Sequence, residues 1–379
     1  MDPLRRNRIG ASVVFVAHGA VTGSFATRVP WLADHVGVST GQLGLALLFP
    51  ALGAMAAMSF TGRLLHRYDG RRITRILLAL WCLSLPLPAL APNLPVLCAA
   101  LLVYGATSGM SDVAMNAQAV VVEQRLGRPI MSGLHGLWSV GGLAASGIGV
   151  AAAAVDLDGR VHFALMAAVL LVVGQLGARL LPPVRPEPDV AEPPAFALPP
   201  RPVLLIGLVG FCAIFGESAG ADWAAKYLTD VANAGQGIAA GAYTGFAFAM
   251  AGGRLVGDAV VARLGVVGTV RLGGVLAAAG AALVVASRAP APGIIGFALL
   301  GIGVSVVVPL TFTAAGSATT HPGHAIAGVA TISYGAGLAA PAVIGGVAAA
   351  TSLPVSFLMV AVLAVLIAVG ATSFRPRRP

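Results

Sequence analysis

Long apolar stretches follow one another along almost the whole chain, and short polar breaks separate them. Each stretch is about 20 residues long, the length that an α-helix needs to cross a lipid bilayer. The twelve windows fall at 10–32, 41–62, 73–92, 94–122, 131–154, 161–181, 203–229, 237–257, 267–287, 292–315, 324–350 and 353–374. The pattern predicts an all-α membrane protein with twelve transmembrane helices.

The chain divides at a proline-rich interruption over residues 182–202, where charges stand between apolar blocks. Proline fixes φ and lacks a backbone donor, so this segment favours a semi-rigid linker over a helix. We expect residues 1–181 to form an N-terminal six-helix bundle and residues 203–379 to form a C-terminal one. The interruption would then be a cytoplasmic linker between the two bundles.

Weak internal repeats support two pseudo-symmetric halves. Phe25–Arg28, late in the first window, matches Trp223–Lys226, late in the seventh. Gly62–Arg67, at the end of the second window, matches Gly257–Gly265, at the end of the eighth. The offset between matched positions is nearly constant, which fits two related bundles that face a central cavity.

Composition excludes an ordinary soluble domain, because 58% of the residues are hydrophobic, 10% are charged and the mean hydropathy is +0.90. The net charge of +9 comes from arginines that cluster in alternate breaks, on the side of the N-terminus. Because basic loops are retained in the cytoplasm, we expect both termini on the cytoplasmic side of a bacterial inner membrane. Topology thus accounts for the positive charge, and we expect no nucleic-acid partner.

The sequence lacks the residue patterns of enzymes and metal sites. Cys82, Cys98 and Cys212 lie inside apolar windows and have neither disulfide-framework nor metal-ligand spacing. There is no paired catalytic Asp, no metal-spaced His cluster and no Ser–His arrangement with supporting context. We therefore expect neither an enzyme nor a bound cofactor.

The loop from Gly62 to Arg72 resembles the signature that the major facilitator superfamily carries between its second and third helices. The loop shares with that signature a Gly, an Arg and a later Gly-Arg-Arg. It departs from the signature at His66, where an Asp is usual, and the spacing to Gly70 is one residue longer. These departures change residues with which the family forms a cytoplasmic ion-pair latch at this loop.

The segments Gly105–Gln118 and Gly216–Trp223 are similar to the fucose-permease-like branch of bacterial permeases. The resemblance covers essentially the whole chain. It implies two six-helix bundles that rock around a midplane site in alternating access, driven by an ion gradient. It also implies a small-molecule substrate, and we expect the transporter to be a monomer in the lipid bilayer.

Two acids inside the apolar windows are the candidates for proton coupling. A charge in hydrocarbon is costly, so each one needs a partner, a cavity or a function. Asp112 lies deep in the fourth window, on a polar stripe with Ser108 and Asn116 at helical spacing. Burial favours its neutral form, as proton carriage requires, although a structural hydrogen bond is the alternative. Glu217 lies between two glycines and could bind substrate or a proton.

Other charges suggest ion pairs and gates. Asp222 and Lys226 stand four residues apart and could neutralise each other near the outer end of the seventh window. Arg28 occupies the position of Lys226 in the repeat, which favours a shared structural role. Glu123 lies beside Arg125 near the cytoplasmic end, where we expect a structural ion pair. The Arg-rich loop supplies the remaining gating candidates, namely Gly62, Arg67 and Arg71.

Candidate substrate-binding residues are polar or aromatic side chains inside the windows. A buried His is as often a hydrogen-bonded core residue as a substrate-binding one, so the structural alternative stays open for His18 and His135. Sugars are commonly bound by an aromatic face together with side-chain hydrogen bonds, which these residues could supply. The candidates are His18, Asn116, Gln118, His135 and Trp138, with Tyr243 and Tyr334 second in rank.

The leading hypothesis is therefore a secondary active transporter for proton-coupled uptake of a sugar-like or other polar metabolite. Two alternatives remain open. One is a proton-driven exporter of amphiphilic compounds, although the fifth window lacks the Gly-Pro pair common in drug antiporters. The other is a non-transporting membrane sensor, which should carry a large soluble output domain.

Overall fold

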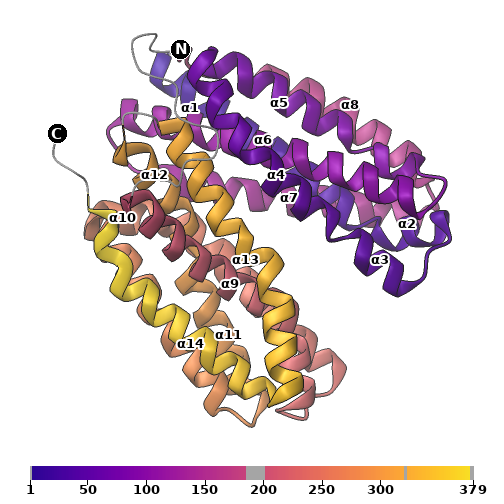
Figure 1. Ribbon diagram of the computed structural model, residues 1–379, viewed down its shortest axis with the longest axis vertical. Coiled ribbons are helices and arrows are strands. Elements are labelled where there is room, and N and C mark those ends of the chain that lie inside the picture. Colours follow the sequence, from indigo (N-terminus) through magenta and orange to yellow (C-terminus); the bar gives the residue numbers. More distant parts are fainter. Residues whose placement is uncertain (1, 185–200, 320–321, 376–379) are drawn as a thin grey trace. The chain divides into compact units, whose positions relative to one another are not determined.

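The computed structural model describes residues 2–184, 201–319 and 322–375, and these residues are nearly all helical with no strand among them (Figure 1). The chain forms two compact units. The first unit comprises Met1–Arg128, Leu137–Ala197 and His321–Ala327. The second unit comprises Pro129–Gly136, Leu198–Thr320 and Gly328–Pro379. Most of the predicted linker, from residue 185 to residue 200, lies outside the described residues.

The helices before the linker are α1 (Pro3–Ala26), α2 (Val29–Val36), α3 (Thr40–Ala46), α4 (Phe49–Arg67), α5 (Gly70–Ser84), η1 (Leu87–Leu90), α6 (Leu94–Leu126), α7 (Met131–Ala154) and α8 (Gly159–Ala178). Those after it are α9 (Arg201–Asp230), α10 (Gln236–Ala286), α11 (Pro290–Ser305), α12 (Val307–Ala318), α13 (Pro322–Ala350), α14 (Leu353–Gly370) and η2 (Ala371–Phe374).

Eleven helical segments in the described part of the chain are long and apolar enough to cross a membrane. One of them belongs to α10, which is interrupted at Gly265 by backbone angles of φ 68° and ψ 170°. The positive φ breaks the helix there, and glycine adopts it at no steric cost. Divided at Gly265, α10 supplies two spans, and the total becomes twelve. The predicted all-α membrane fold is confirmed.

Prolines explain two places where the observed helices differ from the predicted windows. The first window was predicted to run to residue 32, but α1 ends at Ala26 and a separate α2 follows. Pro30 lacks the N–H that would bond to the carbonyl of Ala26. The window 292–315 is likewise broken at Val306, because Pro309 cannot donate to the carbonyl of Ser305.

Close packing of small residues holds the first unit together. A Cβ atom on Gly19 of α1 would collide with the carbonyl oxygen of Trp138 in α7, and one on Gly105 of α6 would collide with that of Pro50 in α4. Helices in a bilayer gain little from apolar burial, so direct backbone approach is a main source of their association. The approach of α6 to α4 is important for function because both helices line the cavity described below.

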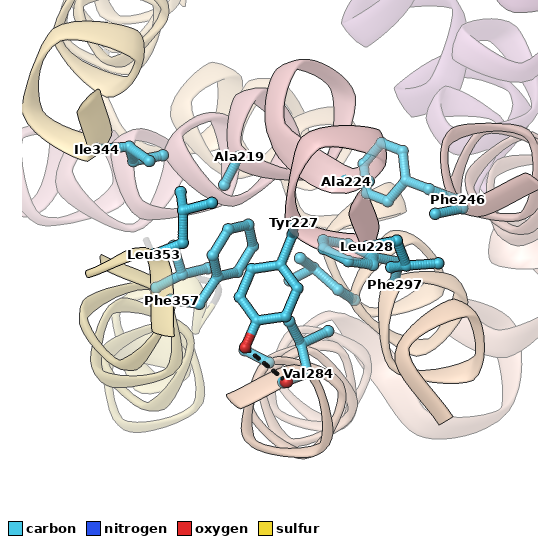
Figure 2. Close-up of a cluster of buried hydrophobic side chains, with 14 of the residues drawn as sticks. Ala219, Ala224, Tyr227, Leu228, Phe246, Val284, Phe297, Ile344, Leu353 and Phe357 are labelled. Carbon is cyan, nitrogen blue, oxygen red and sulfur yellow. Dashed lines mark hydrogen bonds between the residues drawn. The ribbon is translucent and has the colours of Figure 1, made fainter. Parts of the chain in front are cut away.

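Aromatic side chains fill the core of the second unit (Figure 2). The rings of Tyr227, Phe297 and Phe357 meet edge to face, with centroids 5.0–5.9 Å apart. The Tyr227 hydroxyl donates a hydrogen bond of 2.9 Å to the carbonyl of Val284. The buried Tyr227 hydroxyl is thus hydrogen-bonded. The packing of these rings fixes α9 against α10, α11 and α14.

Candidate functional site

A cavity of about 550 Å³ lies within the first unit, and helices α1, α4, α5 and α6 contribute most of its walls. Its volume is in the range of small-molecule sites. It is lined by Thr22, Phe25, Ala26, Val29, Leu47, Pro50, Ala54, Trp81, Tyr104, Gly105 and Ser108. Only Ser108 belonged to the predicted polar stripe, and the aromatic lining residues were not among the sequence-based candidates.

Three aromatic rings form one wall of this cavity. The Tyr104 ring lies between those of Phe25 and Trp81, with centroid distances of 4.6 Å and 4.4 Å. Trp81 and Tyr104 are almost completely buried, which holds their rings in place. In sequence they stand in separate apolar windows, where an aromatic residue is usually part of the core. Only the packing of α1, α5 and α6 brings them to one wall.

His18 lies next to this aromatic wall but outside the cavity lining. The Trp138 indole N–H donates to His18 Nδ1 over 3.0 Å, and His18 Nε2 lies 3.4 Å from the carbonyl oxygen of Ser108. An indole nitrogen can only donate, so Nδ1 must be the acceptor and Nε2 must carry the proton. Both ring nitrogens are therefore engaged within the protein. His18 and Trp138 were predicted to contact substrate, but neither lines the cavity, and their polar atoms bond to the protein.

The predicted polar stripe of α6 begins at the cavity and continues into the first unit. Asp112 stands one helical turn after the lining residue Ser108 and is only 8% exposed. Asn116, one turn further, donates from Nδ2 to the Asp112 carboxylate Oδ1 over 3.2 Å and to its carbonyl over 2.9 Å. The structure thus brings Asp112 and Asn116 together, in a buried setting next to the cavity.

Gln118 lies elsewhere on α6, away from the cavity lining. A Cβ atom on Gly70 would lie 2.7 Å from Gln118 Nε2, so this amide packs against the start of α5. Gln118 is 2% exposed, and its Oε1 has no hydrogen-bond partner among the described residues. The sequence placed Gln118 with Asn116, but two residues along a helix turn the side chain to another face.

The second unit carries a buried ion pair that the sequence analysis missed. Arg254 Nη2 of α10 lies 3.2 Å and 3.1 Å from the two carboxylate oxygens of Glu217 in α9. The Arg254 side chain is 7% exposed and that of Glu217 is 28% exposed. A repeat could have revealed the arginine, because Gly253-Arg254-Leu255 has the same letters as Gly62-Arg63-Leu64.

One turn after Arg254, Asp258 caps the first turn of α7. Its two carboxylate oxygens accept the backbone N–H groups of Ser132 and Gly133, each over 2.9 Å. The Ser132 hydroxyl also donates to the carbonyl of Arg254 over 2.8 Å. All four residues belong to the second unit. A carboxylate at a helix N-terminus satisfies otherwise unpaired donors and opposes the helix dipole.

The predicted pairing of Lys226 with Asp222 is wrong, and Arg28, the counterpart of Lys226, has partners of a different kind. Lys226 forms its salt bridge with Asp230, at 2.7 Å, and not with Asp222. Both acids stand four residues from Lys226, and spacing alone does not choose between them. Arg28, its counterpart in the repeat, is 3% exposed and donates to His162 Nδ1 at 3.4 Å and to the Leu157 carbonyl at 3.1 Å. Arg28 and Lys226 therefore occupy matching positions in the repeat but do not have the same kind of partner.

The loop before α5 is built around close backbone contacts. A Cβ atom on Gly62 would lie 2.9 Å from the Cα atom of His324, at the start of α13 within the first unit. Asp69, the residue before Gly70, caps α5 through the N–H of Arg72 and also accepts the N–H of Val184 at 3.0 Å. Asp69 thus caps α5 and ties its start to Val184.

The loop arginines have mainly local contacts. Arg67 lies over the ring of Tyr68, 5.9 Å from its centroid, and Arg125 donates to the carbonyl of Pro183 at 3.4 Å. Glu123 is buried, at 9% exposure. Its predicted ion pair with Arg125, like the gating role of Arg71, stays a prediction.

The remaining substrate candidates lie in the second unit. His135 stacks on Phe312 with ring centroids 5.8 Å apart, and Tyr334 meets the same ring at 6.5 Å. Tyr243 is 50% exposed. His135 and Trp138 were predicted to cluster because they stand one turn apart on α7, but they belong by their contacts to different units.

Asp158 precedes α8 outside the membrane-spanning segments. The side chain of Arg160 donates to it at 3.0 Å and 3.2 Å, and the Arg160 N–H donates at 2.8 Å. These hydrogen bonds, that from the side chain first, lower the pKa of Asp158 to about 2. Its carboxylate is therefore ionised at neutral pH, where it caps α8.

Membrane-length helices in two units, with a cavity and buried charges inside them, are typical of secondary transporters. A family model described as Major Facilitator Superfamily matches residues 11–341, and the chain belongs to that superfamily. It is accordingly a multi-pass membrane transport protein and not an enzyme.

The curated relatives are similar over nearly their full length. An uncharacterized transporter of this superfamily from Yersinia pestis is 37% identical, covering 98% of this chain and 96% of the relative. An uncharacterized transporter of Sinorhizobium fredii is 35% identical, with 96% of each chain covered. The membrane protein MosC of Rhizobium meliloti is 30% identical over 96% of this chain and 89% of its own.

Solved structures share the fold. The transporter FucP in its outward conformation is similar with a TM-score of 0.77 at 15% identity, covering 100% of this chain and 99% of FucP. A bacterial homologue of the iron transporter ferroportin has a TM-score of 0.76 at 12% identity, with 100% of both chains covered. At such identities the likeness concerns the fold alone.

Proposed function

We propose that this chain is a proton-coupled transporter of a small metabolite, sugar-like or otherwise polar, and that Asp112 binds the proton. The single observation that supports this most is the place of Asp112, buried in a membrane helix one turn from the cavity residue Ser108. We place the protein in the bacterial cytoplasmic membrane, with both termini in the cytoplasm.

The surroundings of Asp112 suit a group that alternates between two protonation states. A carboxylate inside a bilayer is costly, so a proton that neutralises it lowers the cost of moving the helix. The hydrogen bond from Asn116 is compatible with both states, because a carboxyl group protonated on Oδ2 still accepts at Oδ1. Asn116 therefore orients Asp112 without fixing its charge.

Glu217 has a different role in this proposal. Its charge is balanced by Arg254, and a balanced pair costs less in a membrane than either ion alone. Glu217 would bind a proton or substrate only in a state where Arg254 has moved away. The pair thus links any change at Glu217 to a movement of α10.

Asp258 and the loop after α4 are the candidates for gates. Separating the first turn of α7 from Asp258 would break two charge-assisted hydrogen bonds. Separating Gly62 from the start of α13 would open a close backbone contact. Both contacts must be reversible if α7 and α13 move during transport, and Arg67 and Arg71, which follow Gly62 in the chain, stay the gating candidates of this loop.

The alternative of proton-driven export of amphiphilic compounds is favoured by one observation, the largely apolar lining of the cavity. Import and export differ in which side of the membrane the substrate is taken from, and both can use Asp112. Orientation-controlled liposomes separate the two, because a symporter moves substrate and protons in the same direction and an antiporter moves them in opposite directions.

The test uses purified protein in liposomes that contain a pH-sensitive dye and are screened with a panel of metabolites. Wild-type protein should move protons only with a transported substrate. Asp112→Asn should abolish substrate-driven proton movement and uphill transport and should retain counterflow exchange. Asp34→Asn, which alters an exposed acid of α2, is the matched control and should behave as wild type. Survival of gradient-driven uptake in Asp112→Asn would falsify the assignment.

A further inference from the structure

We propose that the cavity of the first unit takes the apolar part of an uncharged ring compound, whose hydrogen-bonding groups are confined to one end. This inference rests on the proposed function in one respect, that the cavity is where a substrate binds. It goes beyond that function by naming the residues that select the ligand, and among the metabolites of that proposal it favours a weakly polar ring over a free sugar.

The first step concerns charge. None of the eleven residues that line the cavity is acidic or basic. A ligand carboxylate or ammonium group placed among them would lose part of its hydration without meeting a counter-ion in the lining. The cavity therefore selects against the charged part of any ligand.

The second step concerns the polar atoms of the aromatic wall. Trp81 donates its indole N–H to the carbonyl of His18 at 3.4 Å. The Tyr104 hydroxyl is buried away from accessible space and has no hydrogen-bond partner among the described residues. Both side chains thus offer the ligand their rings and not their polar atoms. With Phe25, they form a wall suited to a flat apolar face.

The third step locates the polar end. Thr22 and Ser108 are the only hydroxyl-bearing aliphatic side chains in the lining. Both lie beside His18, since the Thr22 hydroxyl bonds to the His18 carbonyl at 3.5 Å and His18 Nε2 approaches the Ser108 carbonyl at 3.4 Å. The hydroxyl groups of the cavity therefore gather where α1 and α6 meet. The rest of the lining is aliphatic, aromatic or glycine.

These steps define a ligand class. A free hexose carries hydroxyls on all sides, and most of them would lose their water hydrogen bonds against the aromatic and aliphatic lining. A ring with one or two hydroxyl or carbonyl groups on one side can bond at Thr22 and Ser108 and can place its apolar body against Trp81 and Tyr104. The class is an uncharged cyclic alcohol, phenol or ketone, or a larger molecule that presents such a part.

The experiment measures binding of three ring compounds to the full chain in lipid nanodiscs by saturation-transfer NMR, with empty nanodiscs subtracted. The probes are cyclohexanol, glucose and cyclohexanecarboxylate, which share a six-membered ring and differ in hydroxyl number or charge. Cyclohexanol should give a protein-specific signal at least tenfold above the other two. Absence of that signal, or an equal signal from glucose or the carboxylate, overturns the proposal.

Matched variants assign the signal to the cavity. Ala54→Leu places a larger side chain in the lining, whereas Ala56→Leu makes the same change at an exposed position of α4. Cyclohexanol binding should be lost in the first and kept in the second. Ser108→Ala should weaken it about fivefold, the effect of one neutral hydrogen bond. Equal binding to both leucine variants contradicts the site.

The same preparation separates this inference from the proposed function. If the probe binds as expected but no compound drives proton movement, proton-coupled transport fails and the ligand class stands. If a free hexose is transported with protons and Ala54→Leu does not affect it, the transport function stands and the ligand class fails.

Discussion

The two units contain the same tripeptide in different surroundings. In the second unit, Arg254 of Gly253-Arg254-Leu255 meets Glu217 of α9 at 3.1 Å. In the first unit, Arg63 of Gly62-Arg63-Leu64 has a buried Nε without a hydrogen-bond partner among the described residues. The difference follows from the neighbouring helix in the second unit, because α9 packs against α10 and places Glu217 opposite Arg254.

The two interiors accordingly handle polarity in different ways. The first unit contains a cavity with an uncharged lining, supported by neutral hydrogen bonds around His18. The second unit holds Glu217, Arg254 and Asp258 in one connected group at the start of α7. The lining of the first cavity is thus uncharged, although Arg28, Asp112 and Glu123 are buried elsewhere in that unit, whereas the second unit places opposite charges in contact. The substitutions that follow test this contrast.

The largest effect is expected for Arg254→Leu. It leaves Glu217 without its partner inside a helical bundle, and we expect a loss of about 2 to 3 kcal/mol in stability, less than for a fully buried pair because Glu217 is partly exposed. Thermal denaturation in detergent measures it. The double variant Glu217→Leu with Arg254→Leu should recover most of the loss. An unchanged melting temperature in the single variant would contradict the importance of the pair.

Asp258→Ala comes next. It removes the cap from Ser132 and Gly133, and we expect a cost of about 1 to 2 kcal/mol. Hydrogen exchange of the first turn of α7, followed by mass spectrometry, should accelerate. Asp258→Asn should be milder, since Asn also caps helices. If exchange at this turn does not change in the alanine variant, the cap does not hold α7.

A smaller effect is expected in the first unit for Trp138→Phe. This change keeps an aromatic ring and removes the donor to His18 Nδ1, at a cost of about 1 kcal/mol. Cavity binding should fall with it if His18 positions the aromatic wall, and Phe211→Leu in the second unit should leave binding unchanged. Wild-type binding in Trp138→Phe would show that the neutral network does not support the cavity.

The smallest effect is expected for Asp158→Asn. This residue lies in an exposed loop, outside the cavity of the first unit and outside the charged group of the second unit. Asn still caps α8, and the exposed pair with Arg160 contributes little. The pKa of Asp158 is lowered to about 2. Any stability that its ionised carboxylate contributes is therefore complete at pH values above the ordinary pKa of an aspartate, and it is lost as the pH falls through about 2. The melting temperatures of variant and wild type should therefore differ by a constant small amount between about pH 5 and pH 8.

Apolar windows located the membrane helices well, and the misplaced boundaries have local causes. The predicted window 131–154 coincides with α7, whereas Pro30 and Pro309 broke two other windows. Arg254 escaped notice because a single arginine near the end of a window reads as a snorkelling side chain. The Gly-Arg-Leu tripeptide that it shares with Arg63 was the signal that could have singled it out.

The sequence by itself determined that this chain is an all-helical membrane protein, because bilayer thickness sets the length of its apolar stretches, and the loop from Gly62 to Arg72 indicated the transporter superfamily. It also marked Asp112 and Glu217, since acids are rare in such stretches. Only the tertiary structure decided that Trp138 bonds to His18, that Arg254 pairs with Glu217 and that Lys226 pairs with Asp230. Helical spacing specifies which residues share a face, whereas contacts between helices depend on packing, which no single window contains.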